Sequence, residues 1–445
     1  MPATPQAPKI LFANVPFDGH FSPLTGLAMH LVNKGYDVRW YSGLCHERKI
    51  AEMGIPMYPF KRALELNQHN TDELFPERKK IKGKMAKLKF DINRFIDRAP
   101  EYYEDIREIH GTFSFDILIC DVVFTGAALI KELMDVPVLA IGVVPLSESS
   151  RDLPPSGMAM LPAKNRMERL KHAVLRYVSR RFIFNDGLKR LNSIYAHYQL
   201  PPYKGVLLDV MCKKADLLLQ SGTPGFEYKR SDLGNNVRFI GPLLPYCSKA
   251  PRPFTAQGRL MLYDKVILVT QGTVEKDPEK LLVPTLEAFK DTAYMVVATT
   301  GGFNTEELRK RFPQKNILIE DFIDFDQIMP LAHVYVTNGG YGGVMLSVKH
   351  RLPMVVAGEH EGKNEINARV GYFGLGVNLR TEAPDPQQVR AAVENVLQDT
   401  SYRNSVAVLA KEFLGYEPAK ATERYVKALL HMRRRDQEIR RLLVK

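Results

Sequence analysis

Short apolar runs alternate with amphipathic stretches along most of the chain. The run at residues 9–15 predicts a buried strand, and residues 16–22 predict a loop. A helix is expected to begin at Pro23 and to stop at Gly35, and residues 37–41 predict a second strand. Because a strand, a helix and a strand follow in this order, this part of the chain predicts a β-α-β unit.

The same alternation continues into the second half. Residues 64–109 are helix-rich and charged, whereas residues 149–193 combine a Pro-Pro-Ser-Gly turn with long basic helices. We interpret residues 149–193 as an insertion that caps one end of the first domain. Further strands are predicted at residues 116–120, 138–144, 216–220, 237–241, 266–270, 295–298, 316–319, 334–337 and 354–357. Helices between these strands predict the α/β class, with parallel sheets covered on both faces.

With 445 residues, the chain is too long for one ordinary core. A polar stretch containing Pro242, Pro245, Pro251 and Pro253 separates the two halves. We predict two doubly wound, Rossmann-like domains that face a central cleft, where open α/β sheets bind ligands. The predicted parts are an N-terminal domain at 1–245, a linker at 246–258, a C-terminal domain at 259–415 and helices at 416–445 that pack back on the first domain.

Composition narrows the class of protein. Hydrophobic residues make up 45% and charged residues 25%, values typical of a soluble globular protein. No apolar run predicts a membrane span or a secretory signal, so we expect a cytoplasmic protein. The scattered cysteines predict neither a metal site nor a disulfide framework. They are Cys45, Cys120, Cys212 and Cys247.

The formal net charge is +12, concentrated at residues 78–89, 164–181 and 433–445. A basic face can meet nucleic acid or anionic lipid. No nucleic-acid motif accompanies the charge, so we do not expect nucleic-acid binding and favour solvated helix faces. No stable membrane insertion is expected. However, residues 167–177 form a basic amphipathic stretch that leaves a weak membrane-surface contact open. The oligomeric state is not predicted.

A glycine-rich turn follows the strand at residues 334–337. It comprises Asn338, Gly339, Gly340, Tyr341, Gly342 and Gly343, and a helix is expected to open at Val344. Without side chains, the backbone N–H groups can approach a ligand, and the helix dipole adds positive charge there. Phosphate is the usual ligand of such a turn.

Polar or aromatic residues follow three other strands of the second half. Gly272 and Thr273 can present N–H and hydroxyl groups to phosphate, although an ordinary turn explains them equally well. Phe322, followed by Ile323, can stack on a nucleobase or belong to the core. The polar segment 358–365 suits a hydroxyl-rich ligand or a solvated loop.

His20 and Asp121 are the candidate catalytic residues. His20 follows the first predicted strand, and Asp121 follows the strand at 116–120, so both belong to one edge of a parallel sheet. A carboxylate beside an imidazole fixes its tautomer and raises its basicity, as a general base requires. A lone structural histidine is the competing interpretation.

Several of these motifs resemble one enzyme family. The segment from Gly19 to Pro23 resembles the Gly-His-x-x-Pro motif of family 1 glycosyltransferases, and residues 322–367 are similar to their donor signature. The closest resemblance is to bacterial flavonoid rhamnosyltransferases, through residues 221–228, 270–276 and 361–367. The resemblance implies a GT-B fold and an inverting, metal-independent transfer of sugar from a nucleotide donor, with no further cofactor.

The resemblance also implies roles for individual residues. His20 is the general base, and Asp121 stabilises its imidazolium. Asn338 stands where the family usually has His, and Phe322 where it usually has Trp. These departures favour dTDP-rhamnose over UDP-glucose. The implied donor-binding residues are Gly272, Thr273, Phe322, Ile323, Asn338, Gly340, Gly342, Gly343, His360 and Glu361.

The acceptor is less well specified by the sequence. Apolar side chains near the insertion suit a flat aromatic acceptor such as a flavonoid, or a lipid-like one. The candidates that would contact it are Phe17, Phe75, Phe90 and Met158.

Three alternatives stay open at this point. The first is a glucosyltransferase that uses UDP-glucose on a natural-product or lipid-like acceptor. The second is a nicotinamide oxidoreductase, but the first turn at residues 16–20 lacks the Gly-x-Gly-x-x-Gly pattern which that class needs. The third is a non-catalytic sugar-nucleotide-binding protein, against which the presence of His20 argues.

Overall fold

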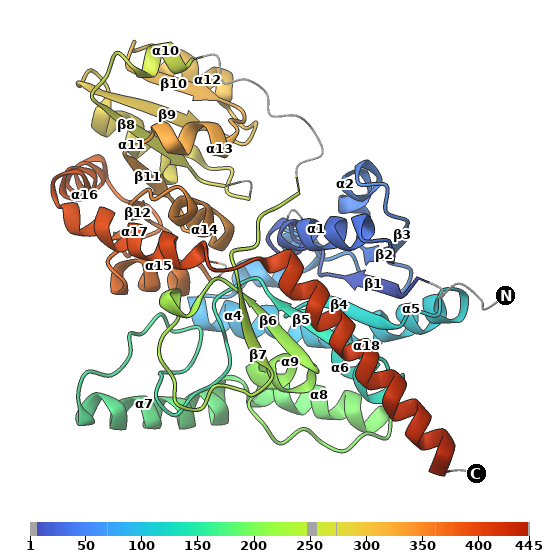
Figure 1. The fold of residues 1–445 in the computed structure, drawn as a ribbon. Coiled ribbons are helices and arrows are strands. Elements are labelled where there is room, and N and C mark those ends of the chain that lie inside the picture. Colours follow the sequence, from blue (N-terminus) through green and yellow to red (C-terminus); the bar gives the residue numbers. More distant parts are fainter. Residues whose placement is uncertain (1–6, 69, 247–255, 273, 361, 444–445) are drawn as a thin grey trace.

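Two parallel sheets form the framework of the protein (Figure 1). The computed structural model describes the chain except residues 1–6, 69, 247–255, 273, 361 and 444–445. The first sheet has the order β3-β2-β1-β4-β5-β6-β7. Its strands are β1 (Lys9–Ala13), β2 (Asp37–Ser42), β3 (Met57–Pro59), β4 (Ile117–Asp121), β5 (Val138–Gly142), β6 (Leu217–Ser221) and β7 (Val237–Gly241).

The second sheet has the order β10-β9-β8-β11-β12-β13, with every neighbouring pair parallel. Its strands are β8 (Lys265–Thr270), β9 (Tyr294–Thr299), β10 (Ile317–Glu320), β11 (Val334–Thr337), β12 (Met354–Val356) and β13 (Gly376–Asn378). The structure confirms the predicted α/β class. The apolar pattern of the sequence does not predict β3 and β13, because three-residue edge strands leave no apolar run to recognise.

Helices cover both sheets. The first half contains α1 (Asp18–Asn33), α2 (Glu47–Glu52), α3 (Thr71–Leu74), α4 (Lys84–Asp97), α5 (Ala99–Thr112), α6 (Gly126–Leu133), α7 (Arg166–Val178), α8 (Asn185–His197) and α9 (Val210–Lys214). The second half contains α10 (Gln257–Leu260), α11 (Leu282–Phe289), α12 (Thr305–Arg311), α13 (Phe325–Ile328), α14 (Tyr341–Lys349), α15 (Lys363–Tyr372), α16 (Pro386–Gln398), α17 (Thr400–Phe413) and α18 (Pro418–Leu443).

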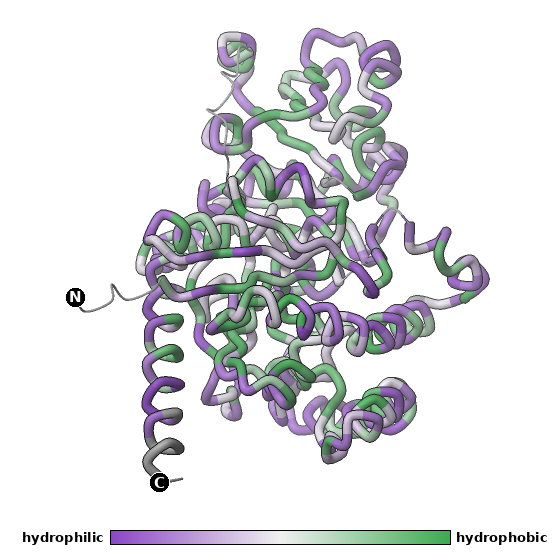
Figure 2. Tube along the Cα trace, turned by 90° about the vertical axis from the view of Figure 1, so that its right-hand side faces the viewer, coloured by the Kyte–Doolittle hydropathy of each residue, from purple (hydrophilic) through white to green (hydrophobic). Residues whose placement is uncertain are grey.

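The last helix lies on the first sheet. Val426, Leu429 and Leu430 of α18 join the hydrophobic cluster that contains Leu24 of α1 and Ile10 of β1. Figure 2 shows the hydrophobic stretches gathered along the central strands, with α18 running down one side of the molecule to the C-terminus. The predicted linker at 246–258 falls largely on residues 247–255, which lie outside the described part of the chain.

Two helices begin earlier than the sequence predicted. Helix α1 begins at Asp18, so Pro23 lies inside the helix rather than at its start. As the sixth residue of the helix, Pro23 removes the N–H that would otherwise donate to the Gly19 carbonyl. Helix α14 begins at Tyr341 instead of Val344, so the second half of the glycine turn is helical. Both shifts place candidate site residues at helix N-termini.

Candidate active site

His20 and Asp121 are in direct contact. The imidazole Nδ1 of His20 lies 3.1 Å from Oδ1 of Asp121. The Asp121 carboxylate is fully buried and also accepts the backbone N–H groups of Val15 and Val123, each at 2.9 Å. The His20 side chain is 20% exposed. Because the carboxylate is held from three directions, it orients the imidazole with Nδ1 inward, which leaves Nε2 able to accept a proton from a ligand.

The first turn of α1 is anchored through Asp18. Lys49 Nζ donates to the Asp18 carboxylate at 2.6 Å, and Gln68 Nε2 donates to it at 3.0 Å. The contact with His46, whose Nε2 lies 3.6 Å from Oδ1 of Asp18, and the ammonium of Lys49 hold the pKa of Asp18 well below its ordinary value, although burial acts in the opposite direction. An acidic residue in the first turn also complements the helix dipole. The start of α1, and with it the position of His20, is therefore fixed.

The glycine turn joins the ends of three neighbouring strands of the second sheet. The Asn338 side-chain amide donates to the backbone carbonyl of Gln271, which follows β8. Asn367 of α15 donates to the carbonyl of Gly358, which follows β12, at 2.9 Å. Gly339 has φ +84°, and a Cβ there would lie 1.7 Å from the Asn367 side chain. Only glycine fits this position.

Helix α14 opens directly from this turn. Its first N–H groups, on Tyr341, Gly342 and Gly343, have no partner within the helix, as in any α-helix. Gly342 is exposed, and a Cβ on Gly340 or Gly342 would meet open space. Open space beside unpaired donors and a helix dipole suits a phosphate group. Gly272, whose φ is +73°, lies exposed on the neighbouring turn.

The carboxyl edges of the two sheets face each other. Helix α1 of the first domain contacts helix α14 of the second. The Tyr341 hydroxyl donates to the backbone carbonyl of Ser221, at the end of β6, at 2.7 Å. These contacts bring the end of α14 that carries the glycine turn to the edge of the first sheet where His20 and Asp121 lie.

Phe322 is an exposed aromatic ring beside this site. Its side chain is 70% exposed, and Cε2 would lie 3.5 Å from a Cβ added to Gly302. It follows β10 at the same sheet edge as the glycine turn. Ile323 packs instead against the hydrophobic core. An exposed ring at the ligand-binding edge of a sheet can stack on a planar group.

Aromatic side chains of the first domain also lie near His20 or in the helical region that follows it. The Phe17 ring lies edge-on to His20, with ring centroids 6.4 Å apart, and packs against Phe95. Phe75 and Phe90 form an edge-to-face pair with centroids 5.9 Å apart, and the Arg94 guanidinium lies over both rings, 5.6 Å from the Phe75 centroid and 5.2 Å from the Phe90 centroid. The structure therefore brings Phe17 to His20. Met158 is half-buried in the loop before α7.

Two candidate residues cannot be placed. Thr273 and Glu361 lie outside the described residues. His360 is exposed, and its backbone N–H donates to Glu382 at 3.3 Å. Gly362, with φ +78°, precedes α15. The polar segment thus follows β12 at the same edge as the glycine turn.

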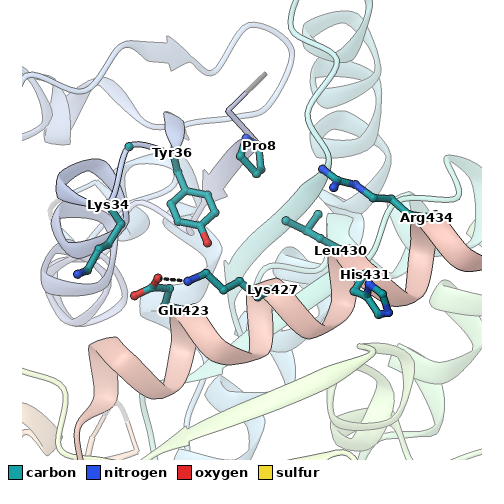
Figure 3. A pocket seen from close by; sticks show the side chains of 9 residues that line it. Pro8, Lys34, Tyr36, Glu423, Lys427, Leu430, His431 and Arg434 are labelled. Atoms are coloured by element: carbon teal, nitrogen blue, oxygen red, sulfur yellow. Dashed lines mark ion pairs between the residues drawn. The ribbon is translucent and has the colours of Figure 1, made fainter. Parts of the chain in front are cut away.

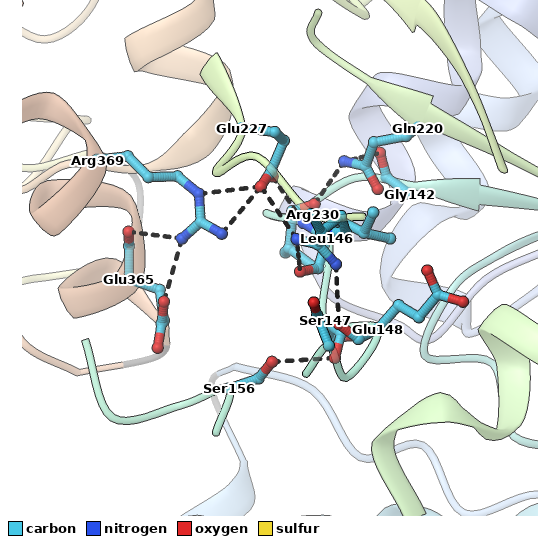
Figure 4. Close-up of polar contacts among 12 residues, drawn as sticks. Gly142, Leu146, Ser147, Glu148, Ser156, Gln220, Glu227, Arg230, Glu365 and Arg369 are labelled. Carbon is cyan, nitrogen blue, oxygen red and sulfur yellow. Dashed lines mark hydrogen bonds and ion pairs between the residues drawn. The ribbon is translucent and has the colours of Figure 1, made fainter. Parts of the chain in front are cut away.

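A buried ionic network that the sequence does not predict joins the two domains (Figure 4). Arg369 of α15, which is 3% exposed, donates to Glu227 of the first domain at 3.0 and 3.3 Å. Arg369 also contacts Glu365 at 3.1 Å. Burial opposes the charge of Arg369, but the carboxylates of Glu227 and Glu365 raise its pKa above the ordinary value. No sequence pattern marks a pair that is 142 residues apart.

Glu365 links this network to the loop before α7. Its Oε1 accepts the backbone N–H groups of Gly157 and Ala159, both at 2.8 Å. Asn364 donates to the Gly157 carbonyl at 3.3 Å. The helix that follows the polar segment of the second domain therefore holds the Met158 loop of the first.

One hollow lies at the opposite edge of the first sheet (Figure 3). It measures about 330 Å³ and lies where β1 and β2 begin, with Lys34, Tyr36 and Lys427 among its lining residues. In a parallel sheet this is the edge far from His20 and Asp121. Within the described residues, no group of three or more His, Cys, Asp and Glu side chains is arranged to hold a metal ion.

Comparisons with known proteins agree with this architecture. Residues 285–428 match the family described as "Erythromycin biosynthesis protein CIII-like, C-terminal domain". The chain is 32% identical to 4'-demethylrebeccamycin synthase of Lentzea aerocolonigenes, over 91% of this chain and 95% of that protein. It is 30% identical to UDP-glycosyltransferase 2 of Phaeomoniella chlamydospora, over 93% and 94% respectively. The crystal structure of the calicheamicin glycosyltransferase shares the fold, with a TM-score of 0.73 at 20% identity over 96% of this chain and 99% of that one.

Proposed function

The chain belongs to the family 1-like glycosyltransferases of the GT-B fold, and from that premise we propose that it moves L-rhamnose from dTDP-rhamnose to a hydroxyl of a flat aromatic acceptor such as a flavonoid. The observation that carries the chemistry is the contact between His20 and the buried Asp121, at a sheet edge that faces the glycine turn.

In the proposed reaction, Nε2 of His20 removes the proton from the acceptor hydroxyl while Asp121 stabilises the imidazolium. The acceptor oxygen attacks the anomeric carbon, and the bond from that carbon to the diphosphate oxygen breaks with inversion. The first N–H groups of α14 and the amide of Asn338 stabilise the leaving diphosphate. Asn338 donates one amide N–H to the Gln271 carbonyl in this structure, and the second N–H of the same group would donate to the phosphate oxygen.

The donor assignment rests mainly on the resemblance to bacterial flavonoid rhamnosyltransferases, and two side chains agree with it. Asn338 is neutral, so the cradle works through amides and the helix dipole rather than through a cation. Phe322 offers a smaller stacking surface than the Trp usual in the family, with the ring exposed toward solvent. These features support a dTDP-linked deoxysugar. UDP-glucose is the competing donor, since other relatives are UDP-glucosyltransferases.

A donor panel with one flavonol acceptor tests the proposal. dTDP-rhamnose, UDP-rhamnose, UDP-glucose and dTDP-glucose are supplied separately, and the glycosides are identified by mass. We expect a rhamnoside with dTDP-rhamnose at the highest rate. Product from UDP-glucose alone would overturn the donor assignment, and free sugar without glycoside from every donor would overturn the acceptor assignment.

A further inference from the structure

Helix α7 presents its apolar side chains to solvent. Met167, Leu170, Val174 and Tyr177 are 83%, 68%, 55% and 66% exposed, and recur every three or four residues, so they form one stripe along the helix. The stripe continues into the π-helical turn η3 (Ser179–Ile183), where Phe182 is 64% exposed. None of the described hydrophobic cores includes a side chain of α7.

The opposite side of α7 faces the protein. His172 is the only residue of α7 that is buried. Arg176 Nη1 donates to the Leu153 carbonyl at 2.6 Å, and Arg180 Nη2 of η3 donates to the Lys204 carbonyl at 3.0 Å. These bonds anchor the helix with its apolar stripe outward. Figure 1 shows α7 at the lower edge of the molecule.

Basic residues flank the stripe. Between residues 164 and 182 the chain has seven Lys and Arg residues and one acid, Glu168. Arg166, Arg169 and Lys171 are exposed, and none of the three has an ion-pair partner in the part of the chain that the structure describes. An apolar stripe between free cations matches the interface of an anionic bilayer, where acyl chains lie beneath negative headgroups.

We propose that α7 and η3 form a docking surface for an anionic membrane, with the helix lying in the plane of the headgroups. Among the described residues, no helix is long and apolar enough to cross a bilayer, so this contact is peripheral. A second copy of the chain fits the surface less well. A two-fold contact through the same stripe would set the flanking cations of both copies against each other.

The docking surface adjoins the acceptor side of the molecule. The loop that leads into α7 carries Met158, and Glu365 holds that loop through Gly157 and Ala159. A docked α7 would therefore place this loop close to the lipid surface, where an apolar acceptor accumulates. Membrane binding itself does not depend on the proposed donor or acceptor.

Vesicle co-sedimentation of the full chain tests the proposal. The probes are vesicles of phosphatidylcholine and vesicles of phosphatidylcholine mixed with phosphatidylglycerol. We expect binding to the mixed vesicles alone, weakened by raised salt. Leu170→Gln and Lys171→Glu should each weaken binding about fivefold or more. The matched controls, Val408→Gln and Lys411→Glu on the exposed face of α17, should bind like the parent.

Three results would overturn the proposal. The first is absence of binding to the mixed vesicles, and the second is binding that the α7 variants share equally with the controls. The third is a concentration-dependent dimer that Leu170→Gln abolishes, which would assign the stripe to a second copy. All four substitutions are at exposed positions, and equal melting temperatures would show that the variants are folded. Transfer activity on a water-soluble acceptor should be unchanged, so failure of docking and failure of the proposed function are distinguishable.

Discussion

The Asp121 carboxylate accepts hydrogen bonds from three donors at once. Replacing it by an amide would therefore disturb at least one of these bonds. The carboxylate holds the His20 imidazole and the N–H groups of Val15 and Val123. An amide has only one oxygen, so Asp121→Asn must turn an NH₂ group toward at least one of these donors. The imidazolium would also lose its counter-charge.

We therefore expect Asp121→Asn to lower the transfer rate by about 100-fold, the low end of what general-base catalysis contributes. The dissociation constant for the nucleoside diphosphate, measured by calorimetry, should stay unchanged because Asp121 is not in the cradle. A variant that transfers sugar normally but binds nucleotide poorly would move Asp121 from the catalytic site to the donor site.

A substitution of Phe322 tests whether its ring stacks on the base of the nucleotide. Its ring is mostly exposed, so truncation should leave the melting temperature almost unchanged. Base stacking on an aromatic ring is worth about 1–3 kcal/mol, so Phe322→Ala should weaken nucleoside diphosphate binding by about 5- to 150-fold. Phe322→Trp is the matched control and should bind at least as tightly as the parent. Equal affinity of all three proteins would place the base elsewhere.

At the scale of elements, the glycines of the turn separate into two kinds. Gly339 is fixed by the fold, since its φ is positive and the Asn367 side chain occupies the place of a Cβ. Gly342 lies in α14 without a positive φ and next to open space. Gly339 is therefore required for the conformation of the turn, whereas Gly342 leaves space for a ligand.

Gly339→Ala should cost about 2 kcal/mol or more in the free energy of unfolding, through left-handed strain and steric clash. Gly342→Ala should keep or slightly raise the melting temperature, because alanine favours a helix, yet weaken donor binding where its methyl group meets the phosphate. Thermal melts and nucleotide titrations measure both effects. Loss of stability in Gly342→Ala with donor binding intact would reverse the two assignments.

Helix α1 carries a pH-dependent contact in its first turn. The pKa of Asp18 lies below its ordinary value of 3.8. The folded state therefore binds this proton less tightly than the unfolded chain does. The stabilisation is fully present above pH 3.8 and decreases as the pH falls toward the lower folded value.

Asp18→Asn should accordingly lower the free energy of unfolding at pH 7 by about 1 kcal/mol, the scale of a carboxylate in the first turn of a helix. The difference between variant and parent should shrink as the pH falls below 3.8. Denaturant unfolding at several pH values measures it. A difference that is the same at every pH would show that Asp18 acts through packing rather than charge.

For the whole molecule, the pattern of apolar runs was enough to predict two parallel sheets. The strands predicted for the middle of each sheet agree with those of the structure, because a strand that is buried on both faces is a continuous apolar run in the sequence. The neighbourhood of His20 and Asp121 was also predictable, since β1 and β4 end at the same edge, with Ala13 beside Cys120.

The contacts between the domains were not predictable. Arg369 and Glu227 are 142 residues apart and meet only in the folded protein. Neither belongs to a local sequence motif that would predict the contact. The sequence did not predict that the apolar stripe of α7 is exposed. A three- and four-residue spacing indicates that a helix has an apolar face, but it does not indicate what covers that face. Phe322 was similarly ambiguous between core and surface until the fold placed it.

The central claim is that His20 is the general base of a sugar transfer. The most direct test compares His20→Ala with the parent enzyme at saturating dTDP-rhamnose and flavonol, with the glycoside quantified by mass and nucleoside diphosphate binding measured in parallel. We predict at least a ~100-fold lower transfer rate with unchanged nucleotide affinity and melting temperature. Transfer at the parent rate by a folded His20→Ala protein would contradict the account.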